Sequence, residues 1–371
     1  MVVTVFLSEA GTERLAVLVP SRSRPQTAPR VPGLLMYVTS CGPVDTMTAM
    51  PSTTGGPRDL ATLEPVPYGH TARRLDWLLL PPMVRRMVED RFGSTVVHAE
   101  SALAGFTPGC ASVLTGADGR RLFLKAASKK AQRPFAAAHA EEIRRLRALP
   151  AGLDVPRLLW SHEDDLWVLL ALEYVDGVNP VRPWDRGELD RCLDALERLA
   201  EQLTPAPIVL RSFAQEFADQ PGCWDHVRRT APGWPHLDEA AGLAATYASG
   251  TVGRTLVHTD VRDDNLLLTA DGRAFLGDWS FPVVGAAWID TVCLLLTAFG
   301  DGVNADALLA ERPLTRDVDP DHVDALLALL CGYFLEHRDQ RPPYSSPFLR
   351  RHQSWCAEVA WGWLSQRRGW T

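Results

Sequence analysis

The fold and the chemistry of this chain are indicated most strongly by residues 257–279, which read VHTDVRDDNLLLTADGRAFLGDW. Asp260 lies in a polar stretch that predicts a loop, and Asn265 opens the apolar run that follows. Asp278 comes directly after a second apolar run. One carboxylate that orients a hydroxyl, with an amide and a second carboxylate that hold Mg²⁺ beside a nucleotide, is the minimum for phosphoryl transfer. The stretch therefore predicts a kinase-like site.

The two apolar runs predict a β-hairpin, because the Asp271-Gly272 pair between them is a strong two-residue turn signal. With this pair at the turn centre, Asn265 faces Asp278, and their Cβ atoms are expected roughly 4.5–5.5 Å apart. A loop one residue longer shifts the register but keeps the two residues as neighbours. Their oxygens can then share one octahedral Mg²⁺.

Each of these residues also has an ordinary structural interpretation. A His-x-Asp triplet is common in caps and turns, Asp278 is compatible with a strand end, and Asn265 is compatible with the close of a turn. Single motif matches carry a high false-positive risk. Their combination on one loop, hairpin and loop favours the functional interpretation.

The motif resembles the aminoglycoside phosphotransferase family, a branch of the protein-kinase-like fold that also includes choline, fructosamine and homoserine kinases. The resemblance is carried by residues 257–268 and 276–279. It implies that Asp260 is the catalytic aspartate and that Asn265 and Asp278 are the metal ligands.

Three further residues take their interpretation from the same resemblance. The family usually has Gly where this chain has Thr259, and a β-branched residue restricts the local backbone, although we do not expect it to abolish activity. His258 resembles a loop-bracing residue rather than a proton carrier. Asp290 matches an aspartate that anchors the catalytic loop through hydrogen bonds. A carboxylate at the N-terminus of the following helix explains Asp290 equally well.

A candidate nucleotide-binding loop lies upstream. Residues 102–113 read ALAGFTPGCASV and predict a small-residue hairpin before a strand. Gly105 and Gly109 would let the backbone approach phosphates, with amide groups as donors. The pattern is neither a P-loop nor a strict kinase glycine motif, so by itself it is a weak signal.

Lys125 ends the next apolar strand, the position from which a kinase lysine contacts the α- and β-phosphates. The alternative is an ordinary lysine at a strand edge. A helix predicted over residues 136–149 follows, and an ion pair from it is expected to fix the Lys125 ammonium, as in the resembled family. The match favours Glu142 as the partner. Glu141 is the second choice and is expected to pair with Arg145 on the solvent side.

The strand predicted over residues 167–175 ends at a polar connector, which we expect to be the hinge between two lobes. The backbone from Glu173 to Val175 would line the edge of a purine, although an ordinary strand end has the same sequence. Helices are predicted beyond it over residues 186–203, 208–217, 237–248, 290–299, 321–336 and 354–364. In the last helix Trp355, Trp361 and Trp363 are expected in the core rather than in a sugar platform.

Together these elements predict an α+β, bilobal protein-kinase-like fold. Residues 76–175 are expected to form an N-lobe with a small antiparallel β-sheet and one helix. Residues 176–371 are expected to form a larger, mostly α-helical C-lobe with the catalytic loop and the acceptor pocket. Residues 1–75, rich in Pro and Gly, are expected to be a disordered extension or an over-long start before Met47 or Met50. A helix predicted over residues 79–91 opens the core.

Composition excludes several other classes of protein. The chain has 371 residues of which 46% are hydrophobic, enough for a large core. A net charge of −7 argues against a nucleic-acid binder, and no apolar run approaches the ~18–20 residues that cross a bilayer. Seven Cys without a CxxC pair indicate reduced thiols and a cytoplasmic location. The ten His show no zinc-binding spacing.

The sequence therefore predicts a small-molecule kinase that uses ATP, or GTP, with Mg²⁺. Its acceptor is expected to be a hydroxyl of an aminoglycoside-like molecule or a related metabolite. The alternative is a nucleotide-binding sensor or scaffold with little turnover. Thr259 and the unorthodox glycine loop give it modest support, whereas the complete set of Lys, Asp, Asn and Asp residues argues against it. A protein or lipid kinase ranks lower, because no Ala-Pro-Glu-like segment follows Asp278. The sequence indicates neither the acceptor nor the oligomeric state.

Overall fold

The structure, a computed structural model, describes residues 56–63 and 71–370 of the chain. These described residues belong to one compact unit. Most of the expected N-terminal extension, including both alternative start methionines, lies outside the described residues.

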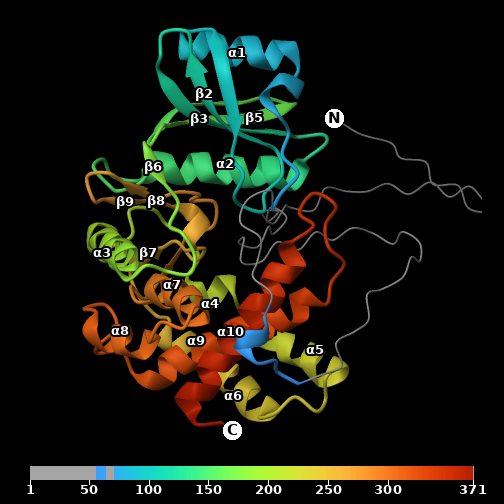
Figure 1. The fold of residues 1–371 in the computed structure, drawn as a ribbon, viewed down its shortest axis with the longest axis vertical. Coiled ribbons are helices and arrows are strands. Elements are labelled where there is room, and N and C mark those ends of the chain that lie inside the picture. Colours follow the sequence, from blue (N-terminus) through green and yellow to red (C-terminus); the bar gives the residue numbers. More distant parts are fainter. Residues whose placement is uncertain (1–55, 64–70, 371) are drawn as a thin grey trace, which may run out of the picture. The chain divides into compact units, whose positions relative to one another are not determined.

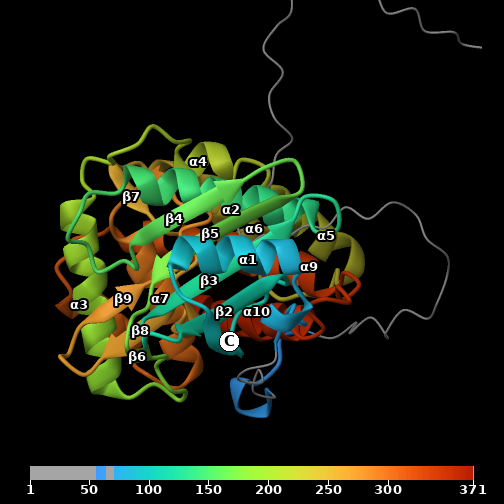
Figure 2. The same cartoon turned by 90° about the horizontal axis from the view of Figure 1, so that it is seen from above.

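The N-lobe contains a five-stranded antiparallel sheet with the strand order β1-β2-β3-β5-β4. Its strands are β1 (Val96–Ser101), β2 (Cys110–Gly116), β3 (Arg121–Ser128), β4 (Leu158–Glu163) and β5 (Trp167–Glu173). Helix α1 (Pro82–Phe92) lies on one face of the sheet and helix α2 (Arg133–Ala148) on the other, as Figures 1 and 2 show.

Side chains along the central strands alternate between the two faces of the sheet, and each face packs against one helix. Leu124 and Leu169 belong to the core cluster with α1, whereas Ala127 and Leu170 belong to the cluster with α2. Successive side chains of a strand point to opposite faces, so Lys125 lies on the α2 face. This periodicity brings the lysine to the helix that carries the predicted partner.

Helix α1 begins at Pro82, three residues later than predicted. The preceding residues Trp77–Leu79 form a 3-10 turn (η3), in which the Asp76 carboxylate accepts a hydrogen bond from the Leu78 N–H at 2.8 Å. Pro is favoured at the first position of a helix, where its missing N–H has no intrahelical partner. Gly93 then ends the helix with φ +72°.

A second sheet, with the order β6-β8-β9, follows the N-lobe. Its strands are β6 (Gly177–Val178), β8 (Leu266–Thr269) and β9 (Ala274–Leu276). The β8–β9 hairpin forms as predicted, but Leu266 pairs with Leu276, so Asn265 faces Gly277 rather than Asp278. The two-residue turn is wrong and the alternative, a loop one residue longer, is confirmed, because the turn has three residues with Gly272 at φ +89°. Asn265 and Asp278 remain neighbours across the hairpin.

The C-lobe is mostly helical, as predicted. Its long helices are α3 (Arg186–Gln202), α6 (Leu237–Gly250), α7 (Ile289–Gly300), α9 (Pro320–Arg338) and α10 (Leu349–Arg368). Its shorter elements are α4 (Phe213–Glu216), α5 (Cys223–Thr230), α8 (Ala305–Glu311) and the paired strands β7 (Thr255–Val257) and β10 (Val283–Gly285). The long helices confirm five of the predicted ranges to within a few residues.

The helix predicted over residues 208–217 is wrong in length, because only α4 forms there. Ser212 caps it: its Oγ accepts from the Gln215 N–H at 3.2 Å, and the Gln215 side chain accepts from the Ser212 N–H at 3.0 Å. This reciprocal capping box starts the helix at Phe213. Helices α5 and α8 were not predicted.

The long helices of the C-lobe enclose the largest core cluster. Trp361 and Trp363 are buried in it, and Trp355 is half-buried against it. The prediction that these side chains pack in the core is confirmed for Trp361 and Trp363, whereas Trp355 lies at the edge of the core. Within residues 56–63 and 71–370, the helices lack the combination of length and apolarity that spanning a membrane requires.

Candidate active site

The loop that follows β7 is anchored by the first turn of α7. The N–H groups of His258 and Thr259 donate to the two carboxylate oxygens of Asp290, at 2.7 and 2.9 Å. Burial raises the pKa of Asp290 to about 6, while these two hydrogen bonds act in the opposite direction. Both interpretations of Asp290 from the sequence therefore apply. It is a carboxylate in the first turn of a helix, and it also holds the loop by hydrogen bonds.

Thr259 has φ +67°, in the left-handed region that favours Gly. This conformation costs an L-residue about 1–2 kcal/mol. The buried Thr259 hydroxyl donates to the carbonyl of Phe281 at 3.0 Å, which offsets part of that cost. The residue that departs from the family pattern is therefore held by both its backbone and its side chain.

His258 connects two loops of the site. Its Nδ1 accepts a hydrogen bond from the Asp260 N–H at 3.2 Å, so its Nε2 carries the proton and donates to the Gly277 carbonyl at 2.9 Å. Burial lowers the pKa of His258 to about 4, which keeps the ring neutral at physiological pH. The contacts are those of a bracing residue.

Asp260 is 2% exposed. Its Oδ1 accepts from the Arg262 guanidinium at 2.8 Å, and the Asn265 Nδ2 donates to its backbone carbonyl at 2.8 Å. Burial raises the pKa of Asp260 to about 7, and Arg262 opposes this shift. Arg262 also pairs with Asp264 at 2.8 Å. Sequence reasoning missed Arg262 as a site residue, although it lies two positions after Asp260 in the motif itself.

Lys125 joins the two lobes. Its Nζ lies 2.8 and 2.9 Å from the two carboxylate oxygens of Glu142 and 3.1 Å from Asp278 Oδ1. Burial opposes the ammonium charge, but Asp278 and Glu142 outweigh it and raise the pKa of Lys125. The expected ion pair with Glu142 is present, and Glu141 pairs instead with Arg144 and, at 3.4 Å, with Arg145.

Asp278 is the second residue of the site in a left-handed conformation, with φ +62°. Its Oδ1 accepts from the Ser280 hydroxyl at 2.6 Å. Burial disfavours its charge, yet Lys125 and Ser280 hold the pKa of Asp278 well below its usual range. Asp278 is therefore a carboxylate at all physiological pH values.

The two segments predicted to bind the nucleotide lie in different parts of the N-lobe. One is the loop between its first two strands, and the other is the end of its last strand. Gly105 and Gly109, with φ +86° and +121°, lie in the loop between the paired strands β1 and β2, and both conformations require Gly. At the end of β5, the Glu173 carboxylate accepts from the Arg157 N–H and Nε at 3.0 and 2.5 Å. The Val175 carbonyl accepts from the Gly177 N–H at 2.9 Å.

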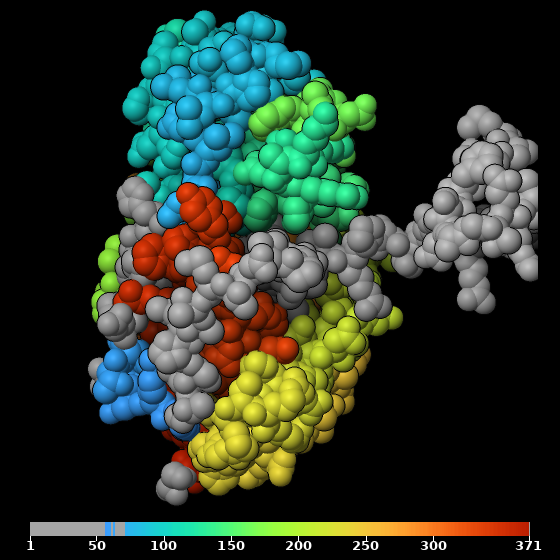
Figure 3. Space-filling model, turned by 90° about the vertical axis from the view of Figure 1, so that its right-hand side faces the viewer, coloured from blue at the N-terminus to red at the C-terminus, as the bar shows by residue number. Residues whose placement is uncertain are grey.

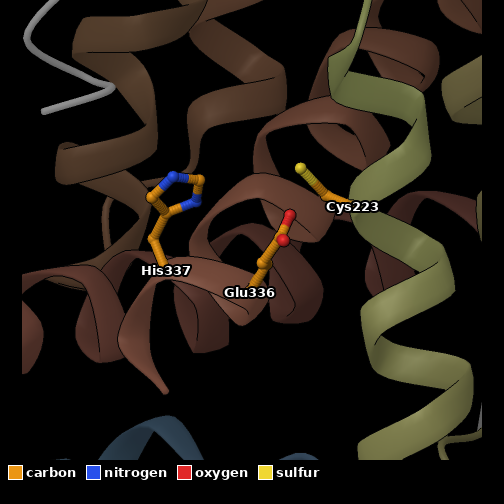
Figure 4. Close-up of side chains that lie close together, drawn as sticks. All are labelled: Cys223, Glu336 and His337. Carbon is orange, nitrogen blue, oxygen red and sulfur yellow. The ribbon is translucent and has the colours of Figure 1, made fainter. Parts of the chain in front are cut away.

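A separate group of potential metal ligands lies between α5 and α9. Cys223, Glu336 and His337 offer ligand atoms within 4.8 Å of one another (Figure 4). The His337 Nδ1 is hydrogen-bonded to the Tyr333 carbonyl at 2.8 Å, and burial raises the pKa of the Cys223 thiol, which disfavours the thiolate that binds metals. Local spacing in the sequence does not reveal this group, because the fold brings its members together.

The family model described as "Phosphotransferase enzyme family" (APH) matches residues 110–326. The chain belongs to this family. The matched residues include Lys125, Asp260, Asn265 and Asp278, whereas the glycine loop precedes them. No curated protein sequence matches the chain.

Solved structures show the same fold. The chain is similar to the choline kinase LicA from Streptococcus pneumoniae, with a TM-score of 0.51 and 15% identity over 75% of this chain and 99% of that one. It is also similar to LicA in complex with AMP (TM-score 0.50, 14% identity, 77% and 100% covered). An aminoglycoside phosphotransferase from Alicyclobacillus acidocaldarius has a TM-score of 0.47 and 16% identity, with 74% and 92% covered. The likeness to LicA and the family match confirm the bilobal protein-kinase-like fold.

Proposed function

We propose that this family member is an ATP-dependent phosphotransferase that moves the γ-phosphate to a hydroxyl of a small molecule. The observation that carries the proposal is the position of Lys125 between carboxylates of both lobes. Its Nζ pairs with Glu142 on α2 and with Asp278 after β9. A fixed cation thus lies beside the carboxylate proposed as a metal ligand, which is the arrangement that a nucleotide polyphosphate with its metal ion requires.

The donor nucleotide is assigned to the N-lobe side of this arrangement. Lys125, braced by Glu142, and the loop with Gly105 and Gly109 hold the triphosphate, and the backbone from Glu173 to Val175 contacts the base. The complex of LicA with AMP supports an adenine nucleotide. Because backbone groups read the base, GTP is the competing donor to be tested.

Asn265 and Asp278 are proposed to hold Mg²⁺. The Asn265 Nδ2 donates to the backbone carbonyl of Asp260 at 2.8 Å and to its Oδ2 at 3.3 Å, whereas the Asn265 Oδ1 accepts no hydrogen bond within residues 56–63 and 71–370. The Asp278 carboxylate is ionised. One amide oxygen and one carboxylate suit this hard cation, which supplies charge neutralisation of the phosphates when bound.

Asp260 is proposed as the catalytic residue. Its carboxylate orients the acceptor hydroxyl toward the γ-phosphorus and takes the hydroxyl proton as the new O–P bond forms and the nucleoside diphosphate leaves. Arg262 and Asn265 fix the carboxylate, because the Arg262 guanidinium donates to its Oδ1 at 2.8 Å and the Asn265 Nδ2 donates to its Oδ2 at 3.3 Å. Catalysis is then mostly positioning and charge neutralisation.

The test is a panel of hydroxyl compounds, including aminoglycosides, macrolides and amino alcohols, incubated with the enzyme, Mg²⁺ and either ATP or GTP. Mass spectrometry should detect a phosphorylated product from one acceptor class, and Asp260→Asn should lose it. Binding of Mg-nucleotide without turnover on any acceptor supports the alternative, a nucleotide-binding sensor. The left-handed Thr259 beside Asp260 is the observation that keeps this alternative open.

A further inference from the structure

Arg74 contacts the glycine loop, residues 102–109, although it lies before α1 and outside the family match. Its Nη1 donates to the Thr107 carbonyl at 2.9 Å, and its Nη2 donates to the Ala104 carbonyl. One planar guanidinium therefore bridges two carbonyls of the loop. A lysine cannot reproduce this, because its ammonium is a single compact charge.

Neighbouring residues hold further carbonyls of the glycine loop. The Thr71 hydroxyl donates to the Gly105 carbonyl at 2.6 Å, and the Leu75 N–H donates to the Gly109 carbonyl at 2.9 Å. From the C-lobe, the Ser346 hydroxyl donates to the Phe106 carbonyl. Figure 3 shows this C-terminal part of the chain, in red, against the blue N-lobe.

In the same loop the Ala102 N–H pairs with the Ala111 carbonyl at 2.8 Å, but the amide groups that follow it have no such partners among the described residues. No backbone N–H of residues 103–107 donates a hydrogen bond within the part of the chain that the structure describes. Successive free amides of this kind form anion-binding concavities. The loop thus has its acceptors occupied and its donors available, which is the state that a phosphate-binding loop needs.

Gly105 shows how closely Arg74 approaches the loop. A Cβ added at Gly105 lies 2.9 Å from the Arg74 Nη2, closer than real Cβ contacts. Position 105 therefore favours Gly through its φ of +86°, and a Cβ there would also displace the Arg74 guanidinium from its present position.

The guanidinium also interacts electrostatically with Asp278, the proposed metal ligand. Its Nε is buried without a hydrogen-bond partner among the described residues. Burial lowers the pKa of Arg74, and the carboxylates of Asp278 and Asp264 oppose this shift. The charge of Arg74 therefore acts on the same carboxylate as that of Lys125.

We propose that Arg74 is a positioning residue that holds the glycine loop around the polyphosphate of the donor nucleotide and adds a positive charge to that site. This inference rests on the proposed function, because it takes the donor to be a nucleoside triphosphate. It extends the nucleotide site beyond the family match to the segment that precedes α1.

The test compares the full chain with its Arg74→Gln and Arg74→Lys variants in calorimetric binding of MgATP and of adenosine. Arg74→Gln should weaken MgATP binding ~10-fold or more, the range for lost hydrogen bonds to a charged group, and leave adenosine binding unchanged. Arg74→Lys should bind MgATP better than Arg74→Gln but less well than the wild type, because it keeps the positive charge and lacks the planar guanidinium that bridges two carbonyls. Arg120→Gln is the matched control, since Arg120 also donates to a backbone carbonyl, that of Phe92, but at the β2–β3 turn.

A double-mutant cycle with Gly105→Ala separates the Arg74 contact from backbone strain. The strain at φ +86° is common to both backgrounds, so Gly105→Ala should weaken MgATP binding less in Arg74→Gln than in the wild type. Equal losses in both backgrounds, or MgATP binding by Arg74→Gln at wild-type strength, overturn the inference alone. A wild type that binds neither MgATP nor MgGTP overturns the proposed function as well.

Discussion

The Thr259 N–H donates to Asp290 Oδ1 at 2.9 Å, and this bond holds a β-branched residue at φ +67° beside the proposed catalytic aspartate. The Thr259 hydroxyl adds a second bond, to the Phe281 carbonyl. Together these contacts explain how a threonine occupies a position where the resembled family usually has Gly.

Thr259→Gly should change the free energy of unfolding by less than about 1 kcal/mol. Relief of about 1–2 kcal/mol of strain is offset by the lost hydrogen bond and by the greater freedom of Gly in the unfolded chain. Thr259→Val keeps the strain and loses the hydroxyl, so it should be the more destabilising of the two. Urea denaturation measures both, and the reverse order would show that the backbone strain is not stored at this residue.

Lys125→Met should destabilise the fold by about 3 kcal/mol, because it leaves the buried Glu142 carboxylate without its cation. The double variant Lys125→Met/Glu142→Leu should recover most of this stability while remaining inactive. Thermal unfolding and turnover measured together on the three proteins test this. A double variant that is no more stable than Lys125→Met contradicts the role of Glu142 as the bracing partner.

Acid should destabilise the protein partly through His139 on α2. Burial lowers the pKa of His139 to about 3, whereas the unfolded side chain titrates near 6.5. The unfolded state therefore binds a proton that the folded state does not, and stability is lost as the pH falls below 6.5. The titration of His139 should lower the free energy of unfolding by about 2 kcal/mol between pH 6.5 and 5.

His139→Gln removes this titration, and it should flatten the dependence of the unfolding free energy on pH by that amount. The comparison is made by urea denaturation of both proteins at pH 7.5 and at pH 5. Identical pH dependences would mean that the imidazole is protonated in the folded state.

Asp260→Asn should lower kcat by ~10²–10⁴, the range for a positioned acid–base group. Its fold and its nucleotide binding should persist, because Arg262 retains Asp264 as a partner. Circular dichroism and MgATP calorimetry are the controls. A variant with wild-type turnover would remove Asp260 from the mechanism.

The sequence predicted the parts of the site that local patterns determine. Period-two alternation in β3 places Lys125 on the α2 face, and the helical pattern offers Glu142 there. The sequence left two hairpin registers open because the residues around Asp271-Gly272 fit a two-residue and a three-residue turn alike, and the structure has the three-residue turn. A local sequence pattern of this kind does not determine the number of residues in the turn.

Contacts across long stretches of chain were not predictable in this way. Arg74 contacts a loop about thirty residues further along the chain, and the sequence around Arg74 contains no motif that predicts this contact. Arg262 was accessible to sequence reasoning, since it lies within the motif and carries a charge beside Asp260. Only the fold shows that its guanidinium is buried against that carboxylate.

The most direct test of the account is electron paramagnetic resonance of Mn²⁺, used in place of Mg²⁺, with ADP and the wild type, Asn265→Ala, Asp278→Ala and the double variant. If both side chains hold one ion beside the phosphates, nucleotide-dependent Mn²⁺ binding should weaken in each single variant, and their combination should be less than additive. Wild-type Mn²⁺ affinity in both single variants would contradict the assignment of Asn265 and Asp278 to a metal-nucleotide site.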